Sequence, residues 1–554
     1  MSTKEPKIRF SRSLKSSTQS LPSPDGAYIA TILPSKLSIR TTRSLEVTRV
    51  VSLPPELASS ISWFLWSSSS SRILLASADF VRVYSATTQF SATISNPTSG
   101  TTKIAHLAFG ADHNEICIFS DFGLKLSICN LLTSRSVEIN SPKFYTPGVV
   151  ARGSSYRPGA RNLALLTRSG GKDIISIHSC DSLEVKRSWC PDIADSQGMQ
   201  WSPDGRWLAV WESAAQGHKL LVYTADGHLF KSWDGPTPVS EDDIDVTLGA
   251  GIKLLDWSSN GMHIAIGDYT DKVTVLSAPS FSESMSIVPT TAFKTRESLQ
   301  IWQEQISHSP TGAYIREFIT ASQSVCPPTS GAPTTSNTDP KMGTNFLSFD
   351  NSATLLATRI ENLPTTIWIW DIGTRILRAV MIMHAPIAKA TWHPTLNEVL
   401  MIRCEGEESK GLVYLWEPSW DRPRILDFRA EIPGGKLLGK TVCRWLTTQS
   451  NNPAVFFSDS QDCILASIPC SDDEDVPWQE AELQTSQQAY NRREESPLDL
   501  MPAAVEGKRG RVSIEDLMDD EEEGITGMSG ESDDPEMEDT FHFKKFVEPT
   551  SRRQ

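Results

Sequence analysis

The sequence has no apolar run that approaches the roughly 20 residues of a membrane-spanning helix. Its first residues, MSTKEPKIRFSRSL, carry charges with no apolar run behind them, so we expect no secretory signal and no membrane partner. The nine cysteines are an odd number and lack the spacing of a disulfide framework. They predict reduced thiols in a cytosolic or nuclear protein.

Linear motifs of catalysis and cofactor binding are also missing. The chain contains no GxxxxGK[ST] phosphate loop, no HExxH zinc helix, no CxxC pair and no GxSxG elbow. A fold can bring distant residues together, so a missing motif does not by itself exclude an enzyme. We expect a protein that is not an enzyme, with no catalytic, cofactor-binding or metal-binding residues.

The negative charge is confined to one end of the chain. The net charge is -15, and residues Ser471–Gln554 contain 24 acidic and 9 basic residues, which leaves 43 of each kind in residues 1–470. A neutral body lacks the wide basic footprint that nucleic acid requires, so we expect no direct nucleic-acid binding. The segment 471–554 has too few apolar residues to offset the entropy of ordering, and it is predicted to be a mostly disordered acidic tail.

What the sequence does contain is a repeated unit of turns and short strands. Residues Gly198–Ser277 show it best, with an apolar strand before and after the Ser-Pro-Asp-Gly turn at Ser202–Gly205. Proline presets one turn dihedral and glycine accepts a positive φ, so the two strands reverse tightly. The alternation around Trp201, Trp207 and Trp211 indicates strands rather than a helix. A four-stranded sheet of this kind needs copies of itself on either side to bury both faces.

Nine copies of the unit follow one another. They start at Leu21, Ile61, Leu107, Ser154, Met199, Leu255, Leu347, Ala390 and Cys443. Most spacings are roughly 43–56 residues, a period typical of propeller blades rather than of helical solenoids. The sequence therefore predicts an all-β β-propeller over residues 1–470.

The ring is expected to close through the N-terminus. The last unit supplies three strands, and a strand at about residues 7–17 has no sheet of its own, so pairing the two removes an exposed edge. We favour one ring of about nine four-stranded blades; a seven-bladed ring with extra units and two smaller rings remain open. A Pro- and Thr-rich insertion at about 320–342 predicts a surface loop. Before it, Phe293–Ile306 fits a strand or a short helix, and a degenerate tenth unit remains open.

Three segments resemble one branch of WD40 propellers. They are Gly251–Leu276, Asp339–Phe349 and the hairpin Thr358–Ile372. This branch is the centrosome and spindle-pole-body WD-repeat family, and the resemblance covers about residues 8–470. It implies a scaffold of the cytoplasm and cytoskeleton, located at the spindle pole body or microtubule-organising centre. It also implies two partners, a coiled-coil anchoring protein and a minus-end-directed kinesin, and a role in anchoring microtubule minus ends in the mitotic spindle.

Departures from the standard repeat are also visible. Only Trp370-Asp371 keeps the Trp-Asp dipeptide after a third strand, and the Gly-His pair is missing from its usual place. Apolar packing is therefore expected to carry more of the stability of the blades.

Propellers bind partners through loops, especially those between the second and third strands of a blade. The loops Gly267–Lys272 and Arg359–Thr366 supply the candidate partner-binding residues Tyr269, Asn362 and Pro364. Each of them also fits an ordinary turn residue. Two other functions remain open at this point, a substrate receptor or adaptor in ubiquitin-dependent turnover and a translation-related propeller.

Overall fold

The computed structural model describes residues 7–58, 60–95, 104–143, 152–236, 250–292, 299–308, 314–321, 323–329, 342–469 and 476–479. The chain divides into two compact units, Met1–Glu482 and Leu483–Gln554. The second unit lies outside the described residues, as do most of the acidic tail and of the loop expected at 320–342. The following description concerns the first unit.

Nine β-sheets follow one another along the described chain, and the strands that make up each blade pair antiparallel. Blades 1 to 3 are built from β3 (Ser20–Pro22), β4 (Tyr28–Leu33), β5 (Lys36–Thr41), β6 (Val47–Ser52); β7 (Trp63–Trp66), β8 (Arg72–Ala76), β9 (Phe80–Ser85), β10 (Ser91–Ser95); and β11 (His106–Phe109), β12 (Glu115–Ser120), β13 (Lys125–Asn130), β14 (Ser136–Asn140). Blades 4 to 6 are built from β15 (Ser154–Tyr156), β16 (Leu163–Ser169), β17 (Lys172–His178), β18 (Val185–Trp189); β19 (Ser196–Trp201), β20 (Trp207–Glu212), β21 (Leu220–Thr224), β22 (Leu229–Trp233); and β23 (Ile252–Trp257), β24 (His263–Asp268), β25 (Val273–Ser277), β26 (Ser282–Ile287). Blades 7 to 9 are built from β29 (Thr344–Phe349), β30 (Leu355–Ile360), β31 (Thr366–Asp371), β32 (Ile376–Ile382); β33 (Ile387–Trp392), β34 (Leu400–Cys404), β35 (Leu412–Trp416), β36 (Arg424–Asp427); and β37 (Val442–Trp445), β38 (Ala454–Ser458), β39 (Asp462–Ser467). One short helix, α1 (Pro55–Ala58), joins blades 1 and 2.

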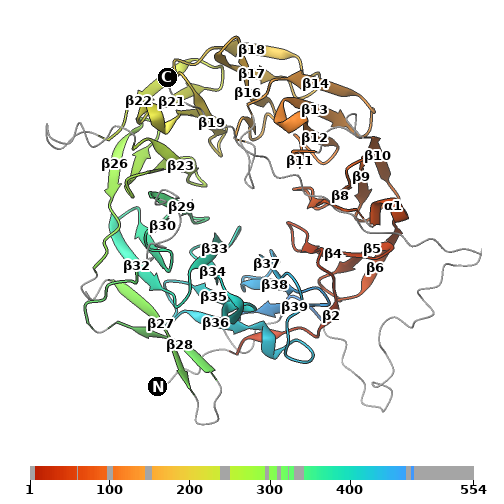
Figure 1. Ribbon diagram of the computed structural model, residues 1–554, viewed down its shortest axis with the longest axis vertical. Helices are drawn as coiled ribbons and strands as arrows, with labels where there is room; N and C mark the ends of the chain where they lie inside the picture. Colours follow the sequence, from red (N-terminus) through yellow and green to blue (C-terminus); the bar gives the residue numbers. More distant parts are fainter. Residues whose placement is uncertain are drawn as a thin grey trace, which may run out of the picture. The chain divides into compact units, whose positions relative to one another are not determined.

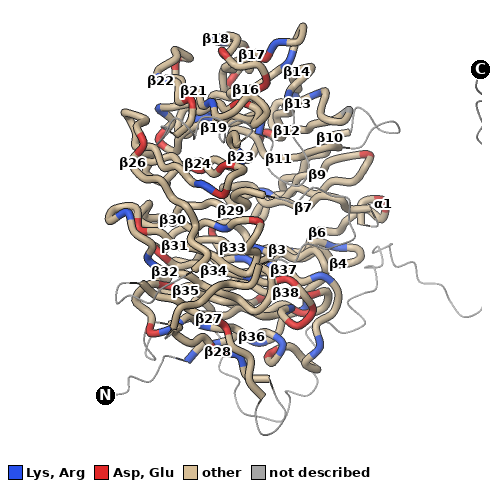
Figure 2. Tube along the Cα trace, turned by 60° about the vertical axis from the view of Figure 1, so that its left-hand side comes forward, with Lys and Arg blue, Asp and Glu red and all other residues tan. Residues whose placement is uncertain are grey.

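The nine sheets form one ring around a common axis (Figure 1). First strands of neighbouring blades contact one another, as in the pairs β23 and β29, β29 and β33, and β3 and β37. Basic and acidic residues are interspersed along the chain of this unit (Figure 2). The prediction of a nine-bladed all-β propeller is confirmed, and the seven-bladed and two-ring alternatives are excluded.

Two short N-terminal strands complete the ninth blade. β1 (Arg9–Phe10) and β2 (Leu14–Lys15) both pair antiparallel with β39, so the strand expected at 7–17 is two strands with a break between them. At the break, the Ser11 N–H donates to the Leu465 carbonyl (2.9 Å) and Ser11 Oγ accepts from the Leu465 N–H (3.0 Å). The edge of β39 is therefore covered by the other end of the chain.

The repeated turn has its own hydrogen-bond arrangement. In blade 5, Ser202 Oγ donates to Asp204 Oδ1 (2.5 Å) and accepts from the Trp207 N–H (3.0 Å), while Gly205 adopts a φ of +69°. Side chains of this kind satisfy turn amides that the strands leave unpaired. The same arrangement recurs at Ser23 with Asp25 and at Ser258 with Asn260.

Tryptophans at the ends of first strands connect neighbouring blades. The indole N–H of Trp392 donates to the Ser348 carbonyl of blade 7 at 2.9 Å. Two equivalent bonds run from Trp66 Nε1 to the Leu21 carbonyl (3.2 Å) and from Trp445 Nε1 to the Thr391 carbonyl (3.0 Å). In blades 2, 8 and 9 this bond ties the blade to the one before it, in addition to the apolar packing between the sheets.

The Trp-Asp dipeptide of blade 7 keeps a hydrogen bond within its own sheet. Trp370 Nε1 donates to the buried Thr358 Oγ1 on the adjacent strand β30 (3.0 Å). The neighbouring Trp368 is fully buried in the core between blades. Indole N–H groups thus form hydrogen bonds both within a blade and between blades.

The insertion before blade 7 forms a β-hairpin rather than a tenth blade. β27 (Gln300–His308) pairs with β28 (Tyr314–Thr320) and lies parallel to β32, so it extends the seventh sheet outward (Figure 1). The described part of Phe293–Ile306, left open between strand and helix, is therefore a strand. Its buried Glu304 carboxylate accepts from Tyr414 Oη (2.7 Å), Arg316 Nη1 (2.9 Å) and the His384 N–H (2.8 Å).

Ordered residues extend past the boundary expected at residue 470. Trp478 is 2% exposed and packs with Leu14, Leu45 and Leu446, between the last blade and the first. The Gln479 N–H donates to the Arg43 carbonyl at 2.7 Å. Residues 476–479 thus contact the ring, because the Trp478 side chain packs into an apolar site.

Candidate functional site

The three residues predicted to contact partners lie at the junction of blades 6 and 7. Tyr269 is in the loop between β24 and β25, whereas Asn362 and Pro364 are in the loop between β30 and β31. Asn362 Nδ2 donates to Asp271 Oδ2 at 3.2 Å, and this bond joins the two loops. The fold therefore brings the predicted residues together on one side of the ring. We call these two loops, together with Met342–Gly343, the junction surface.

Tyr269 is the most accessible of the three. Its residue is 41% exposed, and Lys253 Nζ lies 5.4 Å from its ring centroid. The same ammonium donates to the Met342 carbonyl (2.7 Å) and to Glu361 Oε1 (3.3 Å). Because Lys253 is held by these two bonds, it fixes a positive charge next to an exposed aromatic ring.

Asn362 and Pro364 have structural roles in the same place. Both are half-buried, and the Pro364 carbonyl accepts from the Ile387 N–H of blade 8 (2.8 Å). Asn362 binds blade 6 through Asp271. The loop between β30 and β31 is therefore attached to the blades on both sides, and its shape is set by those contacts.

A close backbone approach requires Gly343. Its φ is +91°, and a Cβ at this position would come within 2.6 Å of the Asp268 carbonyl oxygen and of Tyr269 Cα. The Gly343 carbonyl accepts from the Glu361 N–H (3.1 Å), and the Tyr269 N–H donates to the Ala250 carbonyl (3.1 Å). Only glycine allows the segment before β29 to pack this tightly against the Tyr269 loop.

The electrostatics of the junction surface depend on Asp271. Burial raises the pKa of its carboxyl above the ordinary value, and Asp268 raises it further, whereas the Gly343 N–H, Lys253 and Asn362 lower it. A second carboxyl at this junction is Asp256, which accepts from the Phe349 N–H at 3.1 Å and whose pKa burial raises to about 6. Two partly desolvated carboxyls thus lie at the junction of blades 6 and 7, Asp256 on β23 and Asp271 in the loop between β24 and β25.

Sequence reasoning missed Lys253, Glu361 and the pair Met342-Gly343. Met342 is 51% exposed and extends the apolar part of the junction surface. Lys253 lies on a first strand, where a single lysine gives no local signal of function. The available signal was that all four positions fall inside the segments Gly251–Leu276, Asp339–Phe349 and Thr358–Ile372.

Chemically, the junction surface offers an exposed ring, a fixed cation, a carboxylate and backbone polar groups, which suit contacts with another protein. Within the described residues, no three His, Cys, Asp or Glu side chains are grouped so that they could hold a metal ion. Among the helices in that part of the chain, none is long and apolar enough to cross a membrane.

Comparisons with known proteins agree with the fold. No family model matches the chain. The chain is 26% identical over 416 residues to WD repeat-containing protein WRAP73 of Mus musculus, with 72% of this chain and 84% of that protein covered. It is 23% identical over 330 residues to an uncharacterized WD repeat-containing protein of Schizosaccharomyces pombe, with 56% and 62% covered. A solved structure titled as the crystal structure of the eukaryotic initiation factor matches at 10% identity with a TM-score of 0.47, covering 77% of this chain and 91% of that one. Both relatives are WD-repeat proteins, and the nine-bladed ring of this chain agrees with that similarity.

Proposed function

We propose that this protein is a non-enzymatic scaffold at the spindle pole body or microtubule-organising centre, where it helps to anchor microtubule minus ends and to organise the mitotic spindle. Its proposed partners are a coiled-coil anchoring protein and a minus-end-directed kinesin. The proposed location is the cytoplasm, on the cytoskeleton.

One observation carries this proposal: the segments that resemble the spindle-pole WD-repeat family meet in space. Gly251–Leu276 contacts the described part of Asp339–Phe349 through the Lys253–Met342 bond (2.7 Å). It contacts Thr358–Ile372 through the Asn362–Asp271 bond (3.2 Å). Segments far apart in the sequence thus build one surface, which is what a shared binding site requires.

The chemistry of that surface suits a charged helical partner. A coiled coil presents rows of Glu and Lys beside apolar seams. The Tyr269 ring offers an aromatic anchor, and the Lys253–Glu361 pair at 3.3 Å offers one charge of each sign beside it. Aromatic anchors of this kind carry much of the binding energy of protein interfaces.

The test is imaging of the tagged full-length protein in dividing cells, with co-purification from the same cells. We expect signal at spindle poles, and recovery of a coiled-coil protein and a kinesin. Tyr269→Ala is expected to weaken that recovery by about tenfold or more. Tyr314→Ala removes a tyrosine that is 72% exposed on β28 and serves as the matched control. A uniform signal with normal spindles, or equal recovery by both variants, would contradict the proposal.

A further inference from the structure

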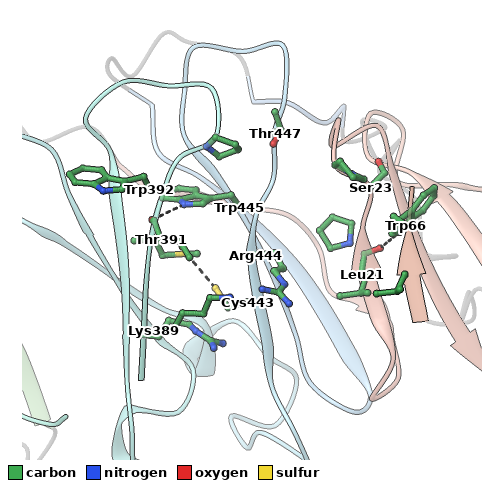
Figure 3. A pocket seen from close by; sticks show the side chains of 16 residues that line it. Leu21, Ser23, Trp66, Lys389, Thr391, Trp392, Cys443, Arg444, Trp445 and Thr447 are labelled. Carbon is green, nitrogen blue, oxygen red and sulfur yellow. Dashed lines mark hydrogen bonds between the residues drawn. The ribbon is translucent and has the colours of Figure 1, made fainter. Parts of the chain in front are cut away.

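A cavity of about 450 Å³ lies along the first strands of blades 8, 9, 1 and 2 (Figure 3). Lys389 and Trp392 of β33, Arg403 of β34, and Arg444 and Trp445 of β37 contribute to its wall. Its volume falls within the range of pockets that hold a drug-sized ligand or a few side chains.

Three cations from two blades converge in this cavity. Lys389 and Arg403 are direct partners in the β33–β34 pairing, and Arg444 comes from the next blade. Within the described part of the chain, none of the three forms an ion pair, and Arg403 Nε is buried without a hydrogen-bond partner. Among the residues that the structure describes, no aspartate or glutamate lines the cavity.

The groups around these cations do not neutralise them. Burial lowers the pKa of Lys389, and the charges of Arg444 and Arg403 lower it further. The Cys443 thiol between them has its pKa raised to about 12 by burial, so it is neutral at physiological pH. A cluster of like charges with no counter-charge is stabilised when an anion enters.

Most of the remaining wall is apolar, and its tryptophan rings are fixed in position. The indole N–H groups of Trp66, Trp392 and Trp445 are each bound to a carbonyl of the preceding blade, at 3.2, 2.9 and 3.0 Å. Their donors are therefore already used, and the rings line the cavity as apolar surface beside Leu21 and Leu65. A ligand that matches this site carries negative charge next to apolar groups.

We propose that this cavity binds an acidic peptide segment of a partner protein, whose Asp or Glu carboxylates contact Lys389, Arg403 and Arg444 while neighbouring apolar side chains pack on the tryptophans. A nucleic acid fits less well, because its affinity comes mainly from cations spread along the phosphate backbone, and this cavity gathers three cations in one place. An inorganic anion would leave the apolar wall uncovered.

The test uses the purified full-length protein and a fluorescein-labelled decapeptide of glutamates with one central phenylalanine. Fluorescence anisotropy at low salt is expected to show binding that weakens as salt rises. The double variant Lys389→Gln/Arg444→Gln is expected to lower the affinity by about tenfold or more. The control, Arg206→Gln/Lys231→Gln, removes the same charge from exposed positions of blade 5 and should bind as the unmodified protein does.

Equal affinity of the two double variants would overturn the proposal. So would binding of labelled deoxythymidine decamer, but not of the peptide, in a manner that depends on Lys389 and Arg444. Removing one of three mutually repelling cations should not lower the melting temperature, so the single variant Lys389→Gln keeps the test informative if the double variant fails to fold. The measurement needs no spindle-pole location, so its outcome is independent of the proposed function.

Discussion

At the scale of single residues, some tryptophans of this ring form hydrogen bonds between blades in addition to packing. Trp66, Trp392 and Trp445 end first strands, and each donates its indole N–H to a carbonyl of the blade before. Trp257 occupies the equivalent position in blade 6, but its Nε1 has no hydrogen-bond partner among the described residues. The chain thus contains the same side chain at equivalent places with and without the bond between blades.

This difference can be measured. We expect Trp392→Phe to lower the free energy of unfolding by about 1 kcal/mol more than Trp257→Phe does, because both lose the same volume and only the first leaves the Ser348 carbonyl without its donor. The two indoles are similarly buried, at 9% and 4% exposure. Chemical denaturation of both variants gives the comparison. Equal losses in the free energy of unfolding would show that the indole hydrogen bond adds no stability beyond that of packing.

At the scale of elements, the hairpin β27–β28 is joined to the ring by the pairing of β27 with β32 and by one buried carboxylate. Glu304 accepts from Arg316 within the hairpin, from the His384 N–H after β32 and from Tyr414 of blade 8. A single side chain therefore links the hairpin to two blades. Removing it leaves a cation and a phenol buried without their acceptor.

We expect Glu304→Ala to loosen the hairpin by about 3–5 kcal/mol, the usual cost of breaking a buried pair. Hydrogen exchange followed by mass spectrometry should show faster exchange in Gln300–Thr320 than in blades 1 to 5. Glu317→Ala, which removes an exposed carboxylate from the same hairpin, is the control. Unchanged protection of the hairpin in Glu304→Ala would mean that strand pairing alone holds it.

The hairpin also marks the limit of what the sequence predicts. The turns at Ser202–Gly205 are local, because serine, aspartate and glycine within four positions determine the backbone. The pairing of β27 with β32 depends instead on residues far along the chain, so Phe293–Ile306 could not be assigned in advance. The same division holds at the junction surface. Tyr269 and Asn362 follow from loop position, whereas Lys253 reaches the Met342 carbonyl and Glu361 only because blades 6 and 7 pack together.

At the scale of the whole molecule, the ring depends on the meeting of its two ends. β39 would be an exposed edge without β1 and β2, and Leu14 of β2 is 2% exposed in a cluster with Trp478 and Phe456. The closure was predictable because a strand with no sheet of its own can pair with the exposed edge of a three-stranded blade. The contribution of Trp478 was not, because an isolated aromatic residue in an acidic segment gives no sign of where it packs.

Deleting residues 1–17 should therefore open the ring at blade 9. The loss of Leu14 burial and of the β39 hydrogen bonds is expected to cost at least about 3 kcal/mol. The uncovered edge of β39 should pair with other copies, because an unpaired strand edge is a template for association. Light scattering coupled to size-exclusion chromatography would reveal oligomers, and thermal melting would reveal the lost stability. Deletion of Leu483–Gln554, the separate second unit, should change neither property. A monomer with an unchanged melting temperature after loss of residues 1–17 would mean that packing between the blades closes this ring without the N-terminal strands.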